Sequence, residues 1–206
     1  TLMLQMTTLL VSLKNYMEYN TLEKKKESLA GKIVNDFVFI HIPKTGGRSI
    51  TQNCFHNQFC MYADWYKYRG YNKFITQVRN PYDRWESMYW HLKRHKEFDY
   101  DFNNWTLKTI IVQSQGIVNM NKVFNKANKY QLKSLCQIMG KPMWFWIDRE
   151  VEVHKLEEGT IWKRLGIEER KLNVGNNRKE VIWSDEAKSV FTKYFERDFK
   201  QFGYDI

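Results

Sequence analysis

The sequence predicts a single α/β domain, built around a central and mainly parallel sheet that is flanked by helices. Two short apolar runs, Phe37–Ile42 and Phe74–Val78, have the length and composition of buried strands. A helix is expected between them, from Gly47 toward Phe55, and another helix follows the second run directly. Because strands joined through a helix pair in parallel, this order favours a βαβ unit. The 206 residues are enough for one domain with a sizeable core.

The beginning of the chain is expected to form a helical segment over residues 1–33, followed by the α/β domain over residues 34–206. The first segment is rich in Leu, Met and Lys, and Gly31 is expected to end its helix. No stretch of the sequence approaches the roughly 20 apolar residues that span a bilayer. We therefore expect no transmembrane segment in this chain.

The helix after the second strand carries a local start signal. Asn80 is a good N-cap and Pro81 stands at the favoured first position, which predicts a helix from Pro81 to about His95. Residues 99–105 are predicted to be a polar, aromatic loop. The later patterns predict two short strands, Trp144–Ile147 and Val151–His154, and helices at Leu107–Gln113, Lys122–Met139, Glu157–Leu165 and Ser184–Phe202, with Gly166 ending the third of these helices.

The composition restricts the class of partner. The formal net charge is +10, from 33 basic and 23 acidic residues. This favours anionic partners such as nucleotides, sulfated or carboxylated sugars, nucleic acid or anionic lipid, without choosing among them. Cys54, Cys60 and Cys136 form no CxxC pair and no cluster with histidines, so no structural zinc is expected.

A first motif follows the first strand, in the sequence Pro-Lys-Thr-Gly-Gly-Arg-Ser over residues 43–49. Such a loop turns backbone N–H groups, a lysine and two hydroxyls toward one point, and the start of a helix adds a positive dipole. A phosphate or sulfate fits there. The lysine precedes the glycines, whereas a nucleotide-hydrolase loop has it after them, and there is no GxGxxG. These differences disfavour both a P-loop NTPase and a dinucleotide-binding domain.

A second motif occupies residues 78–89. Arg79 comes at the carboxyl end of the second strand, where ligands collect in open α/β sheets. Ser87 lies two turns into the following helix, on the same face as Arg84 and His91. An arginine fork and a hydroxyl together suit a phosphate.

A simpler interpretation of this motif has equal standing when the motif is taken alone. The helix would be a capped surface helix, in which Arg84 pairs with Asp83 or Glu86 and binds no ligand.

Taken together, the two motifs resemble the signature elements of sulfotransferases that use 3′-phosphoadenosine 5′-phosphosulfate (PAPS). The sequences Ile-Pro-Lys-Thr-Gly-Gly in the first motif and Arg-Asn-Pro-Tyr-Asp-Arg in the second are most similar to those of the carbohydrate, Golgi-type branch. This branch includes the heparan and chondroitin sulfotransferases. The segments Leu156–Glu158, Arg164–Ile167 and Asp198–Tyr204 also resemble the C-terminal pattern of that branch. The similarity extends from Phe37 to the end of the chain. It implies a P-loop-like, three-layer α/β fold.

The resemblance implies a donor site with two parts. The first part would hold the 5′-phosphosulfate through Lys44, Thr45, Gly46, Gly47, Arg48 and Ser49. The second part would hold the 3′-phosphate through Arg79 and Ser87. Relatives add a late Asn-x-Ser/Thr segment; here Asn176 occupies that region and Arg178 replaces the hydroxyl, so these two residues are weaker donor-site candidates.

The implied reaction is in-line transfer of the sulfuryl group to an acceptor hydroxyl, leaving adenosine 3′,5′-bisphosphate. Lys44 would neutralise the charge that grows on the bridging oxygen, and the scheme requires no metal. A base must take the proton of the acceptor. Relatives use a His or Glu between the motifs, where this chain has His56; Asp64 and His91 are the rival candidates.

Several alternatives stay open. The acceptor implied by the resemblance is a carbohydrate, possibly an anionic one, but protein tyrosine or a small hydroxylated metabolite would suit the same donor site. The chain could also be an inactive relative that binds the donor. A basic module that binds polyanions or nucleic acid is the competing class, although no nucleic acid is expected as a partner. The compartment would be cytoplasmic for a complete chain, or the Golgi lumen if an N-terminal anchor has been removed.

Overall fold

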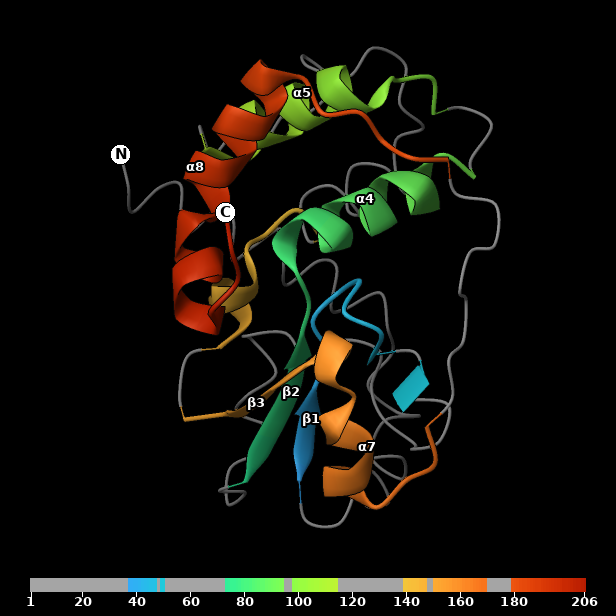
Figure 1. Ribbon diagram of the computed structural model, residues 1–206, viewed down its shortest axis with the longest axis vertical. Coiled ribbons are helices and arrows are strands. Elements are labelled where there is room, and N and C mark those ends of the chain that lie inside the picture. Colours follow the sequence, from blue (N-terminus) through green and yellow to red (C-terminus); the bar gives the residue numbers. More distant parts are fainter. Residues whose placement is uncertain are drawn as a thin grey trace, which may run out of the picture.

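A computed structural model describes residues 37–47, 49–50, 73–94, 98–114, 139–147, 150–169 and 179–206, and Figure 1 shows their arrangement. The predicted N-terminal segment, residues 1–33, lies outside these residues. Nearly all of the helix predicted at residues 122–139 does so as well.

The centre of the described structure is a parallel sheet. Its strands are β1 (Val38–Ile40), β2 (Phe74–Val78) and β3 (Glu152–Lys155), in the order β1-β2-β3. Both neighbouring pairs run parallel. The α/β class with a parallel sheet is confirmed, and β2 has the predicted bounds.

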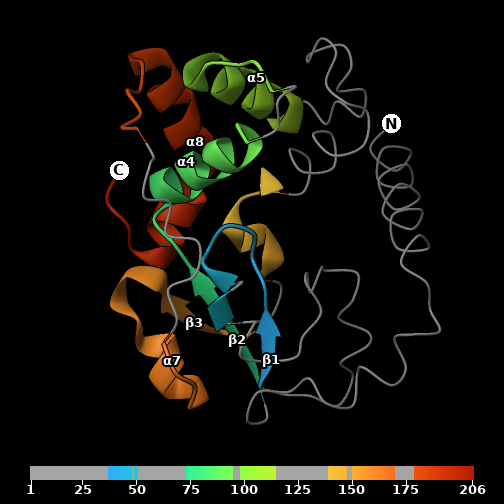
Figure 2. The same cartoon turned by 90° about the vertical axis from the view of Figure 1, so that its right-hand side faces the viewer.

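The two faces of the sheet bury different layers, because successive side chains of a strand point to opposite faces. One face packs against a 3₁₀ helix, η3 (Met143–Trp146), and against the end of the last helix, α8 (Asp185–Phe202). The other face packs against α7 (Thr160–Leu165), which follows a short 3₁₀ helix, η4 (Leu156–Glu158). Figures 1 and 2 show this three-layer arrangement of the described elements.

Helix α4 (Pro81–Leu92) begins where the sequence predicts. The side chain of Asn80 accepts a hydrogen bond from the Tyr82 N–H at 3.0 Å, which satisfies one of the donors that a helix start leaves unpaired. The helix ends at Leu92, three residues before the predicted His95. The start of α8 is confirmed too, with the hydroxyl of Ser184 accepting from the Ala187 N–H at 3.2 Å.

The predicted loop at residues 99–105 is wrong in its second half, because α5 (Phe102–Ser114) already begins there. The side chain of Asp101 accepts from the Asn104 N–H at 2.9 Å and so caps the first turn. Phe102 and Trp105 are three residues apart and both are buried. The aromatic residues of this segment therefore follow helical spacing, and its polar residues are those of a capped helix start.

The predicted strand Trp144–Ile147 is also wrong, since η3 occupies this position. The buried carboxylate of Asp198 accepts from the backbone N–H groups of Met143 at 2.7 Å and Trp144 at 2.9 Å. A strand would need such donors for its ladder. A contact from α8, made 55 residues further along the chain, thus decides the local structure.

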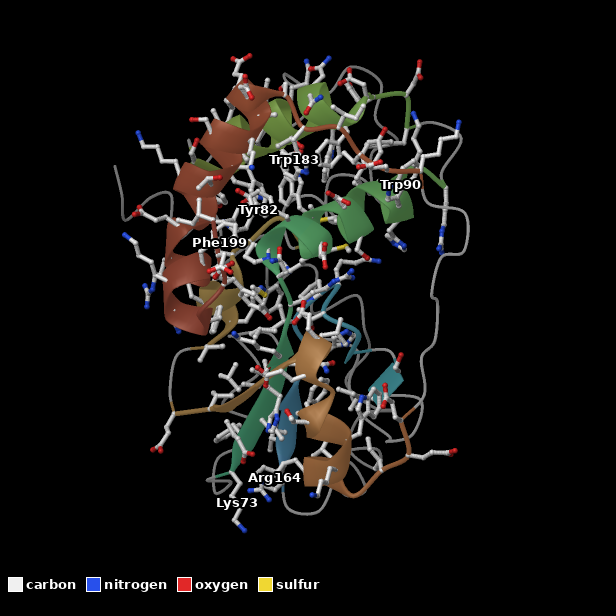
Figure 3. The ribbon with its side chains drawn as sticks, in the orientation of Figure 1. Lys73, Tyr82, Trp90, Arg164, Trp183 and Phe199 are labelled. Carbon is white, nitrogen blue, oxygen red and sulfur yellow. The ribbon has the colours of Figure 1, made fainter. Side chains whose placement is uncertain are left out.

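Helices α4, α5 and α8 pack through an aromatic layer, which consists of Trp85, Tyr89, Phe102, Trp105, Phe191, Phe195 and Phe199. The ring centroids of Trp85 and Trp105 lie 4.8 Å apart, and those of Phe191 and Phe195 lie 4.4 Å apart. At the border of the layer, the ring of Tyr82 contacts Trp183 and Phe199, as Figure 3 shows. Rings of this size dominate the burial of apolar surface in a core.

Candidate functional site

The two sequence motifs meet at one edge of the sheet. Strands β1 and β2 are neighbours and parallel, so their carboxyl ends lie at the same edge. The loop over residues 43–47 follows β1, and Arg79 and helix α4 follow β2. Figure 1 shows the loop between the end of β1 and the start of α4.

Arg84 connects the motifs directly. Its Nε donates to the Pro43 carbonyl at 2.9 Å, and its Nη2 donates to the carbonyls of Met139 at 2.8 Å and Lys141 at 3.0 Å. The side chain is buried, and burial lowers the pKa of the guanidinium to about 10 although Asp198 opposes this shift. Arg84 stays charged at neutral pH and holds three backbone segments together.

The contacts of Arg84 decide between a surface helix and a buried one. Arg84 does not pair with Asp83 or Glu86 at the surface, so the surface-helix interpretation of this residue is wrong. Glu86 instead accepts from Nε1 of Trp183 at 3.0 Å, and Asp83 lies 3.8 Å from Arg79. Nε and Nη2 of Arg84 donate to backbone carbonyls inside the protein. Of the described arginines in the motif, Arg79 is therefore the one that can contact a ligand.

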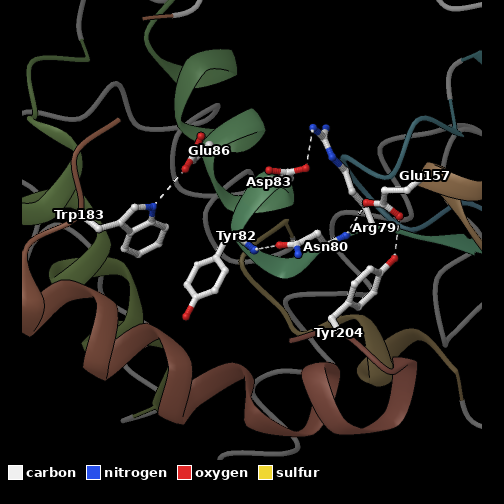
Figure 4. Close-up of polar contacts among 8 residues, drawn as sticks. All are labelled: Arg79, Asn80, Tyr82, Asp83, Glu86, Glu157, Trp183 and Tyr204. Atoms are coloured by element: carbon white, nitrogen blue, oxygen red, sulfur yellow. Dashed lines mark hydrogen bonds and ion pairs between the residues drawn. The ribbon is translucent and has the colours of Figure 1, made fainter. Parts of the chain in front are cut away.

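Arg79 lies at the start of α4 with 22% of its side chain exposed (Figure 4). Its Nη2 is 3.8 Å from Oδ2 of Asp83, a loose contact of the kind that contributes little at a surface. Ser87 is buried one helical turn beyond Asp83, and His91 is half-buried one turn further. Arg79 therefore leans along the helix face that carries Ser87 and His91.

The loop after β1 has an unusual backbone. Lys44 has φ of 68° and Gly46 has φ of 82°, both in the left-handed region. This conformation costs a residue with a side chain about 1–2 kcal/mol, and strain of this kind concentrates at functional sites. The buried hydroxyl of Thr45 donates to the Ile42 carbonyl at 2.9 Å, and the Ser49 N–H donates to the Gly46 carbonyl at 3.0 Å. The Thr45 hydroxyl thus stabilises the turn.

The glycines of the loop let its backbone approach the sheet. A Cβ atom on Gly47 would lie 2.2 Å from Cδ2 of His41, and one on Gly46 would lie 2.9 Å from Cδ1 of Leu156. Any side chain at Gly47 would therefore require the buried His41 ring to move. His41, which directly follows β1, is buried beneath the loop.

Gln77 is the residue that sequence reasoning missed beneath this loop. It is fully buried on β2, and its carboxamide nitrogen and oxygen make no hydrogen bond with the described residues. A Cβ atom on Gly46 would lie 3.3 Å from the Gln77 carboxamide oxygen. Burying such a group without partners costs about 1–3 kcal/mol. A glutamine inside an apolar run, two residues before Arg79, was the available signal.

Glu157 supports the same edge from a distant part of the chain. Its Oε1 accepts from the Asn80 N–H at 2.8 Å and its Oε2 accepts from the Tyr204 hydroxyl at 2.9 Å, as Figure 4 shows. Burial, and then the bond to Glu157, raise the pKa of Tyr204, which keeps its proton at neutral pH. The C-terminal pattern Leu156–Glu158 signalled the segment but not this contact.

Five of the predicted site residues lie outside the described residues: Arg48, His56, Asp64, Asn176 and Arg178. Within the described part of the chain, no three His, Cys, Asp or Glu side chains are grouped so that they could hold a metal ion. Among the same residues, no helix has both the length and the apolar character needed to cross a membrane.

Of three comparisons with known proteins, the one with solved structures found a match. No protein-family model matches the chain, and no curated protein is significantly similar to it. Among solved structures, the crystal structure of a sulfotransferase from Alicyclobacillus acidocaldarius matches with a TM-score of 0.34 and 16% sequence identity. That match covers 70% of this chain and 60% of the other chain. A likeness this distant carries no inference about the activity of the present protein.

Proposed function

We propose that this protein is a sulfotransferase that moves the sulfuryl group of PAPS to an acceptor hydroxyl, with a carbohydrate as the acceptor. One observation carries the proposal. The lysine loop and the arginine motif stand at the carboxyl ends of neighbouring parallel strands, and Arg84 ties the helix of one motif to Pro43 of the other at 2.9 Å. Two cationic segments can therefore serve one ligand.

The donor matches this arrangement because it is anionic at two separate points. Lys44 and the N–H groups of the loop would hold the 5′-phosphosulfate, together with Arg48 and Ser49. Arg79 and Ser87 would hold the 3′-phosphate, which ordinary adenine nucleotides lack.

The donor supplies an activated sulfuryl group, and the protein's own residues position it and manage charge. Lys44 would stabilise the negative charge that develops at the departing phosphate. The acceptor's proton would go to one of His56, Asp64 or His91. His91 lies on α4 one turn beyond Ser87, while His56 and Asp64 lie outside the described residues.

A carbohydrate acceptor is supported by the similarity of the two motif sequences to the carbohydrate branch. The net charge of +10 also suits an anionic glycan. Protein tyrosine and small hydroxylated metabolites are the other acceptors to be tested. The acceptor is tested separately from the donor.

The donor site is tested by thermal melting with adenosine 3′,5′-bisphosphate and with AMP. We expect the bisphosphate to raise the melting temperature clearly more than AMP, and Arg79→Ala to remove this difference. Arg197→Ala, on the exposed side of α8, is the matched control and should preserve it. Equal stabilisation by AMP would contradict the donor assignment, and salt-sensitive binding of single-stranded DNA without any nucleotide effect would favour a nucleic-acid module.

The activity is tested by transfer of radiolabelled sulfate from PAPS to a panel of glycans, tyrosine peptides and small phenols. Lys44→Ala should lower the rate on the order of 10²-fold or more. His56→Ala, Asp64→Ala and His91→Ala should differ, and the base is the one whose loss removes the acidic limb of the pH profile. Bisphosphate binding without transfer to any acceptor would indicate an inactive, donor-binding protein.

A further inference from the structure

The floor beneath the loop is polar where a buried floor is normally apolar. Gln77 shares a face of β2 with Ile75, which packs against α7 in the apolar core. Ile40 pairs with Thr76, so the same register places His41 beside Gln77 one residue further along. Gln77 itself pairs with His154 of β3. Polar side chains thus form a row across the ends of the strands, in which Gln77 lies against Gly46 and His41 against Gly47.

Within this row, the carboxamide of Gln77 is in an exceptional position. It is fully buried, it has no hydrogen-bond partner among the described residues, and it lies against Gly46, whose missing side chain makes room for it. Its two ends can exchange by rotation about the last torsion, so either the N–H₂ or the C=O can face the loop. A buried polar group of this kind calls for an explanation.

The geometry of a peptide group supplies one. In a trans peptide the N–H and the C=O point in opposite directions. When loop N–H groups turn outward to an anion, the carbonyls of the same peptide groups turn inward to the sheet. An inward carbonyl needs a donor. The Gln77 carboxamide lies against Gly46, with its oxygen 3.3 Å from where a Gly46 Cβ would be, and exchanging its two ends would bring the N–H₂ to the loop.

We infer that Gln77 is a positioning residue of the donor loop. Its carboxamide holds the loop in its anion-binding orientation by donating to an inward-facing loop carbonyl other than that of Gly46, which accepts from the Ser49 N–H. The inference rests on the proposed function in that the loop must bind an anion. It adds a residue that makes no contact with the anion and acts through the loop. The bond belongs to the anion-bound protein, so the ligand-free protein gains nothing from the polar group.

This role makes a prediction that an ordinary structural glutamine does not make. Gln77→Met keeps the length of the side chain and removes both unpaired polar atoms. We expect the melting temperature of the ligand-free protein to be unchanged or higher, because apolar groups replace unsatisfied ones. The affinity for adenosine 3′,5′-bisphosphate, measured by calorimetry, should fall about tenfold, as expected for one lost hydrogen bond. Gln201→Met, on the exposed side of α8, should change neither quantity.

The same titrations with AMP and inorganic pyrophosphate separate this inference from the proposed function. If wild type binds the bisphosphate and Gln77→Met binds it equally well, the inference is overturned and the donor site stands. If wild type does not discriminate the bisphosphate from AMP, the PAPS assignment fails; a tenfold weaker pyrophosphate affinity in Gln77→Met would still support the role of Gln77. If wild type binds no anion, both are overturned.

A lower melting temperature of Gln77→Met without a loss of affinity would also overturn the inference, because it would assign Gln77 to the core. Gln77→Leu serves as the second variant if Gln77→Met does not fold. It removes the same polar atoms with a shorter side chain, and the same two outcomes apply to it.

Discussion

Arg84 and Trp85 are neighbours in the chain, yet they face two regions that are built differently. Trp85 belongs to the aromatic layer, where its ring packs against Trp105 and Phe195 and its Nε1 donates to the Thr106 hydroxyl at 2.9 Å. Arg84 faces the loop edge, which we define as residues 43–47 with Gln77 and Arg79. The loop edge contains left-handed backbone at Lys44 and, as far as the described residues extend, a buried amide that makes no hydrogen bond.

The difference teaches how the two regions are stabilised. In the aromatic layer each ring gains from the burial of apolar area and from its neighbours. At the loop edge the same helix supports a backbone that is unfavourable by itself. Local strain and incomplete polar pairing of this kind are expected at sites that a fold maintains for a ligand.

The largest expected effect on stability concerns the aromatic layer. Phe195→Ala removes a ring from a residue that is 1% exposed. The centroid of this ring lies 5.3 Å from that of Trp85 and 4.4 Å from that of Phe191. We expect it to lower the free energy of unfolding by about 3–5 kcal/mol, the usual cost of an aromatic cavity. Urea unfolding measures this. The affinity of the folded variant for adenosine 3′,5′-bisphosphate should stay within about twofold, and a large loss would mean that the two regions are not separate.

Arg84→Met tests the connection between the regions. It removes the donors to Pro43, Met139 and Lys141 and leaves their carbonyls without these partners. We expect a loss of about 3 kcal/mol in unfolding free energy. Bisphosphate affinity should fall as well, because the loop loses its anchor. The control Arg197→Met removes an exposed arginine that lies over Trp144 and should cost less than about 1 kcal/mol. A variant with reduced stability and normal affinity would refute the link to the loop.

Lys44 separates strain from charge within the loop edge. Both Lys44→Ala and Lys44→Gly remove the ammonium group, so both should lose transferase activity. Because φ at this position is 68°, the glycine variant should be about 1 kcal/mol more stable than the alanine variant. Parallel urea titrations measure this difference. Equal stability would show that the left-handed conformation is not maintained in solution.

The smallest expected effect comes from a polar cluster outside both regions. Glu152 accepts from Nε of Arg164 at 2.7 Å and lies 2.9 Å from Nε2 of His154, and the bond from Arg164 lowers the pKa of Glu152. A lowered pKa means that this contribution is present above about pH 4.5, the ordinary value, and is lost as the pH falls through the folded value. Glu152→Gln should flatten this acid limb of the unfolding free energy, by less than about 1 kcal/mol. An unchanged acid limb would show that Glu152 does not contribute to the pH dependence of the unfolding free energy.

The elements that the sequence predicted correctly depend on contacts within a few residues. The bounds of β2, the cap at Asn80 and the cap at Ser184 follow from an apolar run and from capping chemistry. The left-handed Gly166 at the end of α7 is of the same kind. The two motifs could be placed at one edge because parallel strands end together.

The features that sequence reasoning missed depend on distant partners. The segment predicted as a strand forms η3, where Asp198 accepts from the Met143 N–H, 55 residues away in the sequence. Glu157 accepts from the Asn80 N–H, 77 residues away. Whether Arg84 would serve a ligand, a surface carboxylate or the loop backbone could not be decided from its spacing, since each choice depends on what lies opposite the helix. The hydrogen bond from Arg84 to Pro43, 41 residues away, gives the answer.

That bond has a practical consequence for protein engineering. A short peptide with the sequence of residues 37–50 would lack the guanidinium that holds Pro43. Anyone who transplants this turn into another scaffold must therefore carry α4 with it, in the same orientation, or supply a substitute arginine from the host.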